Sequence, residues 1–597
     1  MANENGFNMH VFRDGRRDTA GRALLDALIA GLAAIASASD GERRRRLLVD
    51  ILVRAGELES ILADLNARDA AQIPAVTDAL AEALVATEAV GNDDFAVNSS
   101  PRLDGAADGE APFAGGADGD GRAARGAHRL RDLASQLRGV EVPAVVRAAP
   151  PEGFSYYALH PLDFATLVGE LSVAPGDGYV IGIRSIGTTL SAVVAAALRC
   201  RGIASSRITV RPSGHPYDRE VRFSEEELRW VQRGITTSAS FFVVDEGPGL
   251  SGSSFLSVAE LLIAAGVPRE RITLLGTRVP DAERLLAPDG ALRFSAFTLR
   301  AVTAARRVPG SASVILGGGA WRSHLCPDEA RWPASWAPME RPKFLDPVAA
   351  RFFKFKGLGR YGVEARDRAE WIHRAGFGLS PRDEGDGFVS YPWLPGPLLS
   401  AADLDRAITN RLADYCVFRA RAFPAPNGGG RELVRMLRDN IEVACGKPLD
   451  TGFTLEVRFP IIADAHMMPH AFRRDARGEL MKVSATAHGD DHFFPGPTDI
   501  AWDLAGAIVE WQMPAEARRA FLDRYRRLSG DAPEGRLSAY LFAYTLFRVA
   551  YTAMAAASCR GSAEEGRLLR EQARYRELLD TSYRAGEGRG AASLLSG

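Results

Sequence analysis

The sequence of 597 residues predicts an α/β fold, with a parallel-sheet domain, a second α+β domain and an N-terminal helical region. Continuous apolar strands alternate with helices between Val142 and Arg306, as in a parallel sheet that is covered on both faces. Residues from Thr19 to Val90 are rich in alanine and leucine at helical spacing. The remainder, from Asp346 to Gly597, begins with the strand-like "RFFKFKGLGRYG" and then becomes largely helical.

The chain is too long for one hydrophobic core, because domains usually hold roughly 100–200 residues. A shift to glycine, alanine and aspartate predicts a linker, since such a segment cannot bury enough apolar surface to offset its ordering entropy. We therefore expect a helical domain at 1–90, a flexible linker at 91–126, the parallel-sheet domain at 127–310, a connector at 311–345 and the C-terminal domain at 346–597.

Composition limits the partners and the compartment. The formal net charge of −2 provides no field that would attract nucleic acid or an anionic membrane. No apolar run reaches the ~18 residues of a membrane span, and no signal-peptide core is present near the start. The five cysteines are scattered without zinc-ligand spacing, which fits a reducing compartment. We expect a cytoplasmic protein with small-molecule partners; its oligomeric state stays open, with a homodimer as one option.

The parallel-sheet domain can be followed element by element. Its expected strands are "GYVIGI", "RITVRP", "SFFVVD" and "RITLLG", and its expected helices are "TTLSAVVAAALRCRG", "EEELRWVQRG" and "FLSVAELLIAAG". In such sheets ligands bind beyond the carboxyl ends of the strands. The third strand ends in two adjacent carboxylates, so its end is the first candidate site.

The stretch "FFVVDEGPGLSGSS" combines two acids with a glycine and serine loop that leads into a helix. Gly247, Gly249 and Gly252 allow backbone N–H groups to face inward, and the helix adds its positive end, which suits a phosphate monoester. Asp245 and Glu246 suit vicinal hydroxyls, because two carboxylates can accept hydrogen bonds from both OH groups of a ribose. The pattern predicts a ribose 5-phosphate site.

This stretch resembles the phosphoribosyl pyrophosphate (PRPP) signature of type I phosphoribosyltransferases. The resemblance implies that Asp245 and Glu246 hold the ribose 2′- and 3′-hydroxyls, with Mg²⁺ bound largely by PRPP itself. The implied loop for the 5-phosphate comprises Gly249, Leu250, Ser251, Gly252, Ser253 and Ser254. Leu250 and Ser251 depart from the family, which usually has threonine and glycine there.

An earlier segment resembles the pyrophosphate loop of the same family. It comprises Arg184, Ser185, Ile186, Gly187 and Thr188, after the strand "GYVIGI". The leaving pyrophosphate needs a cation and free N–H groups, which Arg184 and the helix start would supply. An ordinary strand–turn–helix is the alternative. Between the two loops, "VRPSGHPYDREVRFS" predicts a mobile flap.

Three residues of this flap, Arg211, His215 and Arg219, are candidates for contacts to a polyanion, and solvated loop charges are the equal alternative.

The C-terminal domain resembles aminoglycoside-phosphotransferase-like kinases. The resemblance is carried by "FFKFKGLGRYG", by "GFVSYPWLPGPLL" and by "TDIAWDLAGAIVEW", which is similar to the "GDPAYDLA" segment of those enzymes. It implies that Lys354 contacts ATP phosphates, that Glu370 is its partner on the following helix, and that Tyr391–Leu394 form the hinge beside the adenine.

The expected catalytic elements depart from that family. "IIADAHMMPHAF" would be the catalytic loop, with Asp464 as the base, but it is one residue longer. Ser484 stands where a metal-binding aspartate is expected, and a hydroxyl cannot replace a carboxylate's charge on Mg²⁺. Asp490 and Asp491 are the candidate metal ligands. An active kinase, a nucleotide-binding pseudokinase and a purely structural lobe all stay open.

Together the resemblances imply a transferase. The main hypothesis is a PRPP-dependent phosphoribosyltransferase, of the glycosyltransferase class, which moves 5-phosphoribosyl to an unidentified nitrogenous acceptor. Its cofactor would be Mg²⁺, with ATP as the ligand of the kinase-like domain. One alternative is a non-catalytic regulatory protein that senses PRPP or a nucleotide. The other is an ATP-dependent small-molecule phosphotransferase.

Overall fold

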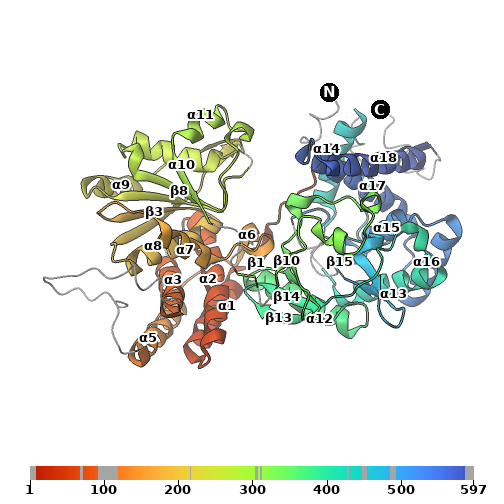
Figure 1. Cartoon of the computed structure of the whole chain (residues 1–597), viewed down its shortest axis with the longest axis horizontal. Coiled ribbons are helices and arrows are strands. Elements are labelled where there is room, and N and C mark those ends of the chain that lie inside the picture. The colour runs from red at the N-terminus through yellow and green to blue at the C-terminus, as the bar shows by residue number, and fades with distance from the viewer. Residues whose placement is uncertain are drawn as a thin grey trace.

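The computed structural model describes residues 9–67, 72–91, 119–215, 217–249, 251–302, 307–308, 312–425, 429–446, 449, 453–483 and 492–584. Most of the expected linker at 91–126 lies outside the described residues. Figure 1 shows two units side by side, one built on a parallel sheet and the other on an antiparallel sheet with a helical lobe. Within the described ranges, no helix combines the length and the apolar character needed to cross a bilayer.

The first unit is built on a five-stranded sheet of order β4-β3-β7-β8-β9, in which every pair is parallel. Its strands are β3 (Gly178–Ile183), β4 (Ser205–Val210), β7 (Ser240–Val244), β8 (Ile272–Gly276) and β9 (Thr298–Ala301). Side chains alternate along β3, so that Val180 packs into one hydrophobic core and Ile181 into the core on the other face. The predicted parallel sheet with two covered faces is confirmed.

Helices cover both faces of this sheet. Those of the unit are α1 (Gly21–Ser37), α2 (Gly41–Asp64), α3 (Gln72–Gly91), α5 (Gly119–Leu137), α6 (Glu152–Tyr156), α7 (Pro161–Glu170), α8 (Ile186–Cys200), α9 (Glu225–Thr236), α10 (Ser253–Ala264) and α11 (Gly290–Ser295). One core joins α8 to the N-terminal helices, and the other joins the sheet to α9 and α10. The structure thus places the N-terminal helices in one unit with the sheet, and not in a domain of their own. The sequence could not predict this, because helical spacing reveals an apolar face but not the element that packs on it.

The second unit begins with a five-stranded antiparallel sheet of order β10-β11-β12-β14-β13. Its elements are β10 (Val314–Ile315), β11 (Lys343–Asp346), β12 (Arg351–Phe355), α12 (Gly359–Arg374), β13 (Arg382–Gly385) and β14 (Phe388–Pro392). Two of these strands come from the segment 311–345, which the sequence analysis treats as a connector. Residues 316–342, which join β10 to β11, are called the strap below; they contain the 3-10 turns η5 (Ala320–His324), η6 (Glu329–Arg331) and η7 (Ala337–Met339).

A helical lobe follows the antiparallel sheet. It contains α13 (Arg406–Ala422), α14 (Arg431–Cys445), β15 (Pro460–Ile462), β16 (Phe472–Arg474), β17 (Leu480–Lys482), β18 (Pro497–Asp499), α15 (Ala501–Glu510), α16 (Ala515–Ser529), α17 (Glu534–Ser558) and α18 (Ala563–Arg584). Its core includes Trp502 and Trp511, both fully enclosed. The largely helical character expected after residue 346 is therefore confirmed.

The first described residues of the chain pack into this lobe. Met9 and Val11 are buried in its hydrophobic core. The His10 N–H donates to Asn440 Oδ1 at 2.6 Å, and Asn440 Nδ2 donates to the His10 carbonyl at 2.8 Å. Further along, the strand β1 (Arg17–Ala20) pairs with β2 (Val145–Ala148) beside the first unit. The N-terminal segment therefore ties the two units together.

We expect Asn440→Ala to lower the free energy of unfolding by about 1–3 kcal/mol, because both backbone groups of His10 lose their partner. Chemical denaturation followed by tryptophan fluorescence measures the change. Asp439→Ala is the matched control, since it removes only the exposed 2.7 Å pair between His10 and Asp439, worth less than about 1 kcal/mol. Equal effects of the two substitutions would show that the N-terminal segment is not held as described.

Candidate functional site

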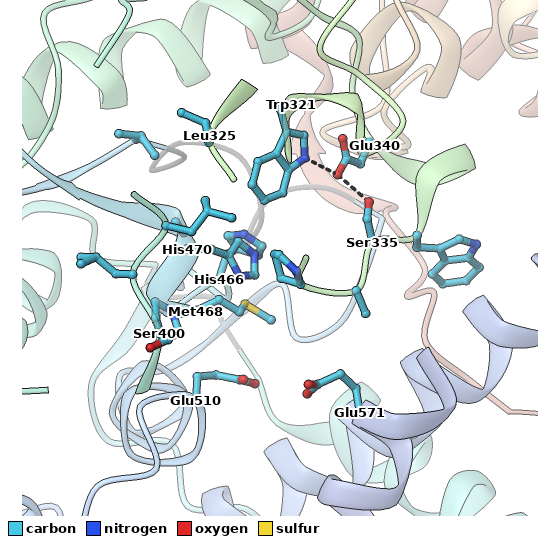
Figure 2. Close-up of a pocket in the computed structure, with 18 of the residues that line it drawn as sticks. Trp321, Leu325, Ser335, Glu340, Ser400, His466, Met468, His470, Glu510 and Glu571 are labelled. Atoms are coloured by element: carbon cyan, nitrogen blue, oxygen red, sulfur yellow. Dashed lines mark hydrogen bonds between the residues drawn. The ribbon is translucent and has the colours of Figure 1, made fainter. Parts of the chain in front are cut away.

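A cavity of about 500 Å³ lies between the antiparallel sheet and the helical lobe. One wall comes from β11, β12 and the segment after β14, and the opposite wall comes from the loop after β15 and from α15, α17 and α18. The strap forms the remaining side. Figure 2 shows Trp321 and Glu340 of the strap across from His466 and His470, with Glu510 and Glu571 at the far end.

One end of the cavity is flat and apolar. Phe352 lines it and stacks on Tyr391, with ring centroids 5.1 Å apart and planes inclined by 22°. Trp393 meets Phe352 edge-on at 6.2 Å. Leu379 and Leu394 complete this wall. Such a slot suits a planar aromatic group, and it contains part of the predicted hinge Tyr391–Leu394.

Next to the slot, the sheet presents cations to the cavity. Lys354 on β12 lines it, as do Lys343 on β11 and Arg341 of the strap. Burial, together with the neighbouring charges of Lys343 and Arg341, lowers the pKa of Lys354 to about 7, although Glu340 opposes the shift. Burial also lowers the pKa of Lys356 well below its usual range. This face of the sheet is therefore suited to an anionic ligand.

The strap is attached to the C-terminal helix α18. The Arg322 guanidinium makes a bidentate salt bridge to the Glu564 carboxylate, with 3.0 Å between Nη1 and Oε1 and 2.9 Å between Nη2 and Oε2. Arg322 is 4 % exposed. The backbone N–H of Ser335 donates to the same carboxylate at 2.6 Å. Bidentate pairs between arginine and a carboxylate hold the two groups in one orientation, in addition to the attraction between their charges. The strap is thus held closed over the cavity by contacts to a helix more than 200 residues further along the chain.

The loop after β15, predicted to be catalytic, does not present Asp464 to the cavity. Asp464 is 3 % exposed and accepts hydrogen bonds from Lys482 Nζ at 2.9 Å and from the Tyr415 hydroxyl at 2.5 Å. Burial opposes its ionisation, but Lys482 and Arg419 hold the pKa of Asp464 below its usual range. The expectation that Asp464 is a substrate-facing base is corrected: its charge is used inside the lobe.

A second aspartate shapes the same loop. The carboxylate of Asp503 accepts the N–H of Asp464 at 2.8 Å and that of Ala465 at 2.9 Å. These bonds fix the loop backbone and direct the next side chain, His466, to the cavity wall together with His470. Burial lowers the pKa of His470 to about 3, and Trp321 of the strap stacks on its ring at 5.6 Å. The titratable groups of this loop at the cavity are therefore histidines.

Glu370 does not take the predicted place beside Lys354. Its carboxylate pairs with Arg374 Nε at 2.9 Å, one turn along α12, and its side chain is 38 % exposed. The carboxylate nearest the lysines is instead Glu340 of the strap, because Lys343 Nζ lies 2.8 Å from Glu340 Oε2. Burial alone would raise the pKa of Glu340, but Lys343 lowers it to about 2.

The predicted metal ligands Asp490 and Asp491 lie outside the described residues, as does Ser484. Within the part of the chain that the structure describes, no group of three histidine, cysteine, aspartate or glutamate side chains is arranged to hold a metal ion.

At the carboxyl end of β7, the two predicted acids face backbone amides. Glu246 Oε2 accepts the Gly153 N–H at 3.0 Å, and the Asp245 carboxylate accepts from the amides of Glu246 and Gly187. Burial raises the pKa of Asp245 to about 7 and that of Glu246 to about 8, and Glu152 adds repulsion on Glu246. Strongly perturbed carboxyl pKa values cluster at functional sites.

The predicted phosphate loop is described except for Leu250. Gly252 has φ +70°, a left-handed conformation that favours glycine, and it immediately precedes α10. The Ser251 and Ser253 hydroxyls lie 2.9 Å apart, and the Ser253 N–H donates to Ser251 Oγ at 3.2 Å. Gly249 is exposed, and Ser254 lies in the first turn of α10. The loop thus forms a compact turn at a helix N-terminus.

The predicted pyrophosphate and flap arginines contact α2. Arg184 Nη1 lies 3.2 Å from Asp64 Oδ1, and Arg211 Nη2 lies 2.6 Å from Asp64 Oδ2. Helix α2 also packs closely on the first turn of α8, since a Cβ on Gly56 would lie 1.9 Å from Thr189 Oγ1. The two arginines therefore share one carboxylate of a helix that was not expected to contribute to this site.

The remaining residues of the two predicted loops lie at the start of α8 and on a β-hairpin. Ser185, with φ 113°, Ile186, Gly187 and Thr188 form the turn into α8, and the last three are buried. His215 and Arg219 lie on a hairpin formed by β5 (Ser213–His215) and β6 (Asp218–Glu220), where His215 is exposed. The hairpin agrees in position with the predicted flap.

Comparisons with known proteins were made for the whole chain. No known family model matches the sequence, and no curated protein matches it. Among solved structures, similarity is found to choline kinase LicA from Streptococcus pneumoniae, with 12% identity, TM-score 0.28, and coverage of 40% of this chain and 90% of that one.

A choline/ethanolamine kinase family protein from Mesorhizobium loti has 16% identity and TM-score 0.29, and the match covers 44% of this chain and 95% of that one. An ethanolamine kinase from Plasmodium vivax has 9% identity and TM-score 0.28, and the match covers 40% of this chain and 80% of that one. These proteins are kinases, and they lend no support to the predicted phosphoribosyltransferase.

Sequence reasoning missed the residues that the strap and the C-terminal helices bring to the cavity. Trp321, Glu340, Arg548 and Arg574 line it, although they lie up to 253 positions apart, from 321 to 574. No local motif marks them. The one available signal was the unusual Trp, Pro and Arg content of the segment 311–345, which indicates a packed structure better than a connector.

Because Asp464 is buried with two cations, Asp464→Ala should lower the free energy of unfolding by about 3–5 kcal/mol, since it leaves the buried Lys482 without its carboxylate partner while Arg419 keeps Asp503. Thermal and chemical denaturation measure this loss. Asp475→Ala, at a turn near the surface, is the control and should cost far less. A folded Asp464→Ala variant with undiminished stability would contradict the structural role described for this carboxylate.

Proposed function

We propose that the cavity of the second unit binds a nucleoside triphosphate and that the chain is an ATP-dependent phosphotransferase acting on a small molecule. The observation that carries the proposal is the position of Lys354, on the wall of a 500 Å³ cavity between an aromatic slot and a group of further cations. A nucleotide needs both features, a flat apolar surface for its base and positive charge for its phosphates.

The contacts suggest how the ligand would lie. The adenine ring would enter the slot beside Phe352 and Trp393, where stacking and apolar contact hold it. Lys354 lies two residues after Phe352 and therefore on the same face of β12, so the phosphates would point toward it. The acceptor would occupy the far end, beside Tyr551, Glu571 and Arg574.

The chemistry is the attack of an acceptor hydroxyl oxygen on the γ-phosphorus, with cleavage of the bond to the β-phosphate oxygen and release of ADP. Such a transfer depends mainly on positioning and on neutralising the phosphate charge. We assign His466, which lines the cavity on the loop fixed by Asp503, to accept the acceptor's proton. Asp464 is engaged with Lys482 and is not available for this role.

The resemblance of the C-terminal sequence motifs to kinases also implies Mg²⁺. The carboxylates on the cavity wall each have a partner: Glu340 pairs with Lys343, Glu510 accepts from Tyr544 and Tyr575, and Glu571 pairs with Arg574. These described residues do not make a metal site, so no step is derived through a metal ion.

A second candidate function is PRPP binding at the carboxyl end of β7, as the substrate of a transferase or the ligand of a sensor. The observation that favours it is the pair of partly buried carboxyl groups with raised pKa, beside a glycine turn at a helix N-terminus. Against it, Arg184 and Arg211 both pair with Asp64, and both acids already accept backbone hydrogen bonds.

For the first function, we expect calorimetric titration to detect ATP binding and a phosphate-transfer assay over small alcohols to detect ADP release. Lys354→Met should weaken ATP binding roughly tenfold or more, because a charge-assisted hydrogen bond is worth about 1.5–3 kcal/mol. Arg351→Met is the matched control, since Arg351 faces the other side of β12 and bonds Ser390. If neither the wild type nor the control binds ATP at millimolar concentration, the proposal is wrong.

The same titration has an expected pH dependence. Lys354 has a pKa of about 7 without ligand, so it loses its charge as pH rises through 7. A phosphate favours the charged form, so binding takes up a proton and ATP affinity should fall from pH 6 to pH 8.5. In Lys354→Met this fall should be smaller.

For the second function, titration with PRPP and Mg²⁺ should give a measurable affinity, and the double variant Asp245→Asn/Glu246→Gln should reduce it at least tenfold. Glu152→Gln, which keeps both acids, is the control. Pyrophosphate release over a panel of nitrogenous acceptors separates an enzyme from a sensor, because a sensor releases none. Undiminished PRPP binding in the double variant would remove the ribose role of the two acids.

A further inference from the structure

Two lysines face one another across the strands that form the cavity wall. Lys343 on β11 is the register partner of Lys354 on β12 in an antiparallel pair. Side chains directly opposite in such a pair project to the same face with Cβ atoms roughly 4.5–5.5 Å apart. Both lysines line the cavity. Like charges in this position destabilise a sheet, so the arrangement requires negative charge nearby.

Glu340 supplies part of that charge. Its carboxylate lies 2.8 Å from Lys343 Nζ. It also accepts hydrogen bonds from Trp321 Nε1 at 3.1 Å, from the Ser335 hydroxyl at 2.7 Å and from the Gly319 N–H at 3.1 Å. Figure 2 shows Trp321, Ser335 and Glu340 grouped at the edge of the cavity. Glu340 would therefore keep three donors even if Lys343 moved away.

Three basic side chains lie on the cavity wall beside this carboxylate: Lys343, Lys354 and Arg341. Lys343 is a flexible side chain whose charged end can turn from one partner to another. Glu340 is held in the strap, which Arg322 and Glu564 attach to α18. The mobile member of the ion pair is thus the lysine.

We propose that Lys343 is a second phosphate-binding lysine of this cavity, which exchanges the Glu340 carboxylate for a ligand phosphate, and that Glu340 is a built-in competitor of the ligand. The inference rests on the proposed nucleotide site. Two adjacent ammonium groups match neighbouring phosphates, so the ligand class is one with two or more linked phosphates. A monophosphate can engage only one of the lysines fully.

A purely structural role for Lys343 makes a different prediction. If its pair with Glu340 only secures the strap, then loosening the strap elsewhere should have the same effect as removing Lys343 or Glu340. Glu564→Gln tests this, because it weakens the attachment of Arg322 and Ser335 without touching either residue of the Lys343–Glu340 pair. A comparison of nucleotides with one, two or three phosphates then distinguishes phosphate binding by Lys343 from a purely structural role.

The experiment measures dissociation constants for ATP, ADP and AMP in the full-length wild type and in Lys343→Met, Lys343→Arg, Glu340→Gln and Glu564→Gln. We expect Lys343→Met to weaken ATP about tenfold, ADP less and AMP hardly at all, with Lys343→Arg close to the wild type. Glu340→Gln should strengthen ATP binding severalfold and leave AMP unchanged. Glu564→Gln should shift all three nucleotides by a similar factor.

Each outcome bears on the inference separately from the proposed function. If Lys343→Met keeps the wild-type ratio of ATP to AMP affinity, or if Glu340→Gln weakens ATP as Glu564→Gln does, the second-lysine inference is overturned while nucleotide binding stands. If the wild type binds none of the three nucleotides, the proposed function fails. Circular dichroism of each variant confirms that its fold is retained before the affinities are compared.

Discussion

The repulsion between cations on the cavity face of β11 and β12 is the constraint on which the surrounding structure depends. Lys343 and Lys354 are held opposite one another by the register of two strands, and burial prevents water from screening them. The strap brings Glu340 to this face, and α18 holds the strap in place through Glu564. The strap thus provides a negative charge next to the two lysines.

The short helix α6 joins the two candidate sites. At its start the Gly153 N–H meets Glu246, which lies at the carboxyl end of the parallel sheet. At its end Tyr156 lines the cavity of the second unit beneath Arg341, whose guanidinium lies 4.8 Å from the ring centroid. Figure 1 shows α6 between the two units. Together with the N-terminal segment in the helical lobe, this contact makes the chain one interlocked assembly.

The candidate sites differ in how well the sequence predicted them. The resemblance to kinases singled out Lys354 and the segment Tyr391–Leu394, and the structure places Lys354, Trp393 and Leu394 on the cavity wall. Asp464 and Glu370 were assigned from the resemblance to kinase motifs and their spacing, and in the structure Asp464 pairs with Lys482 and Glu370 with Arg374. Spacing identifies a loop or a helix, but it does not say toward which neighbour a carboxylate turns.

The sequence by itself determined the elements: the buried strands of the parallel sheet, the helices between them and the strand that carries Lys354. These follow from periodicity, which is a property of neighbouring residues. Only the tertiary structure decided which residues meet in the cavity, since the Lys343–Lys354 register, the Glu340 counter-ion and the attachment of Arg322 to Glu564 join distant segments. Pairing of strands and docking of a strap are nonlocal events, and their energies are set by contacts that no window of sequence contains.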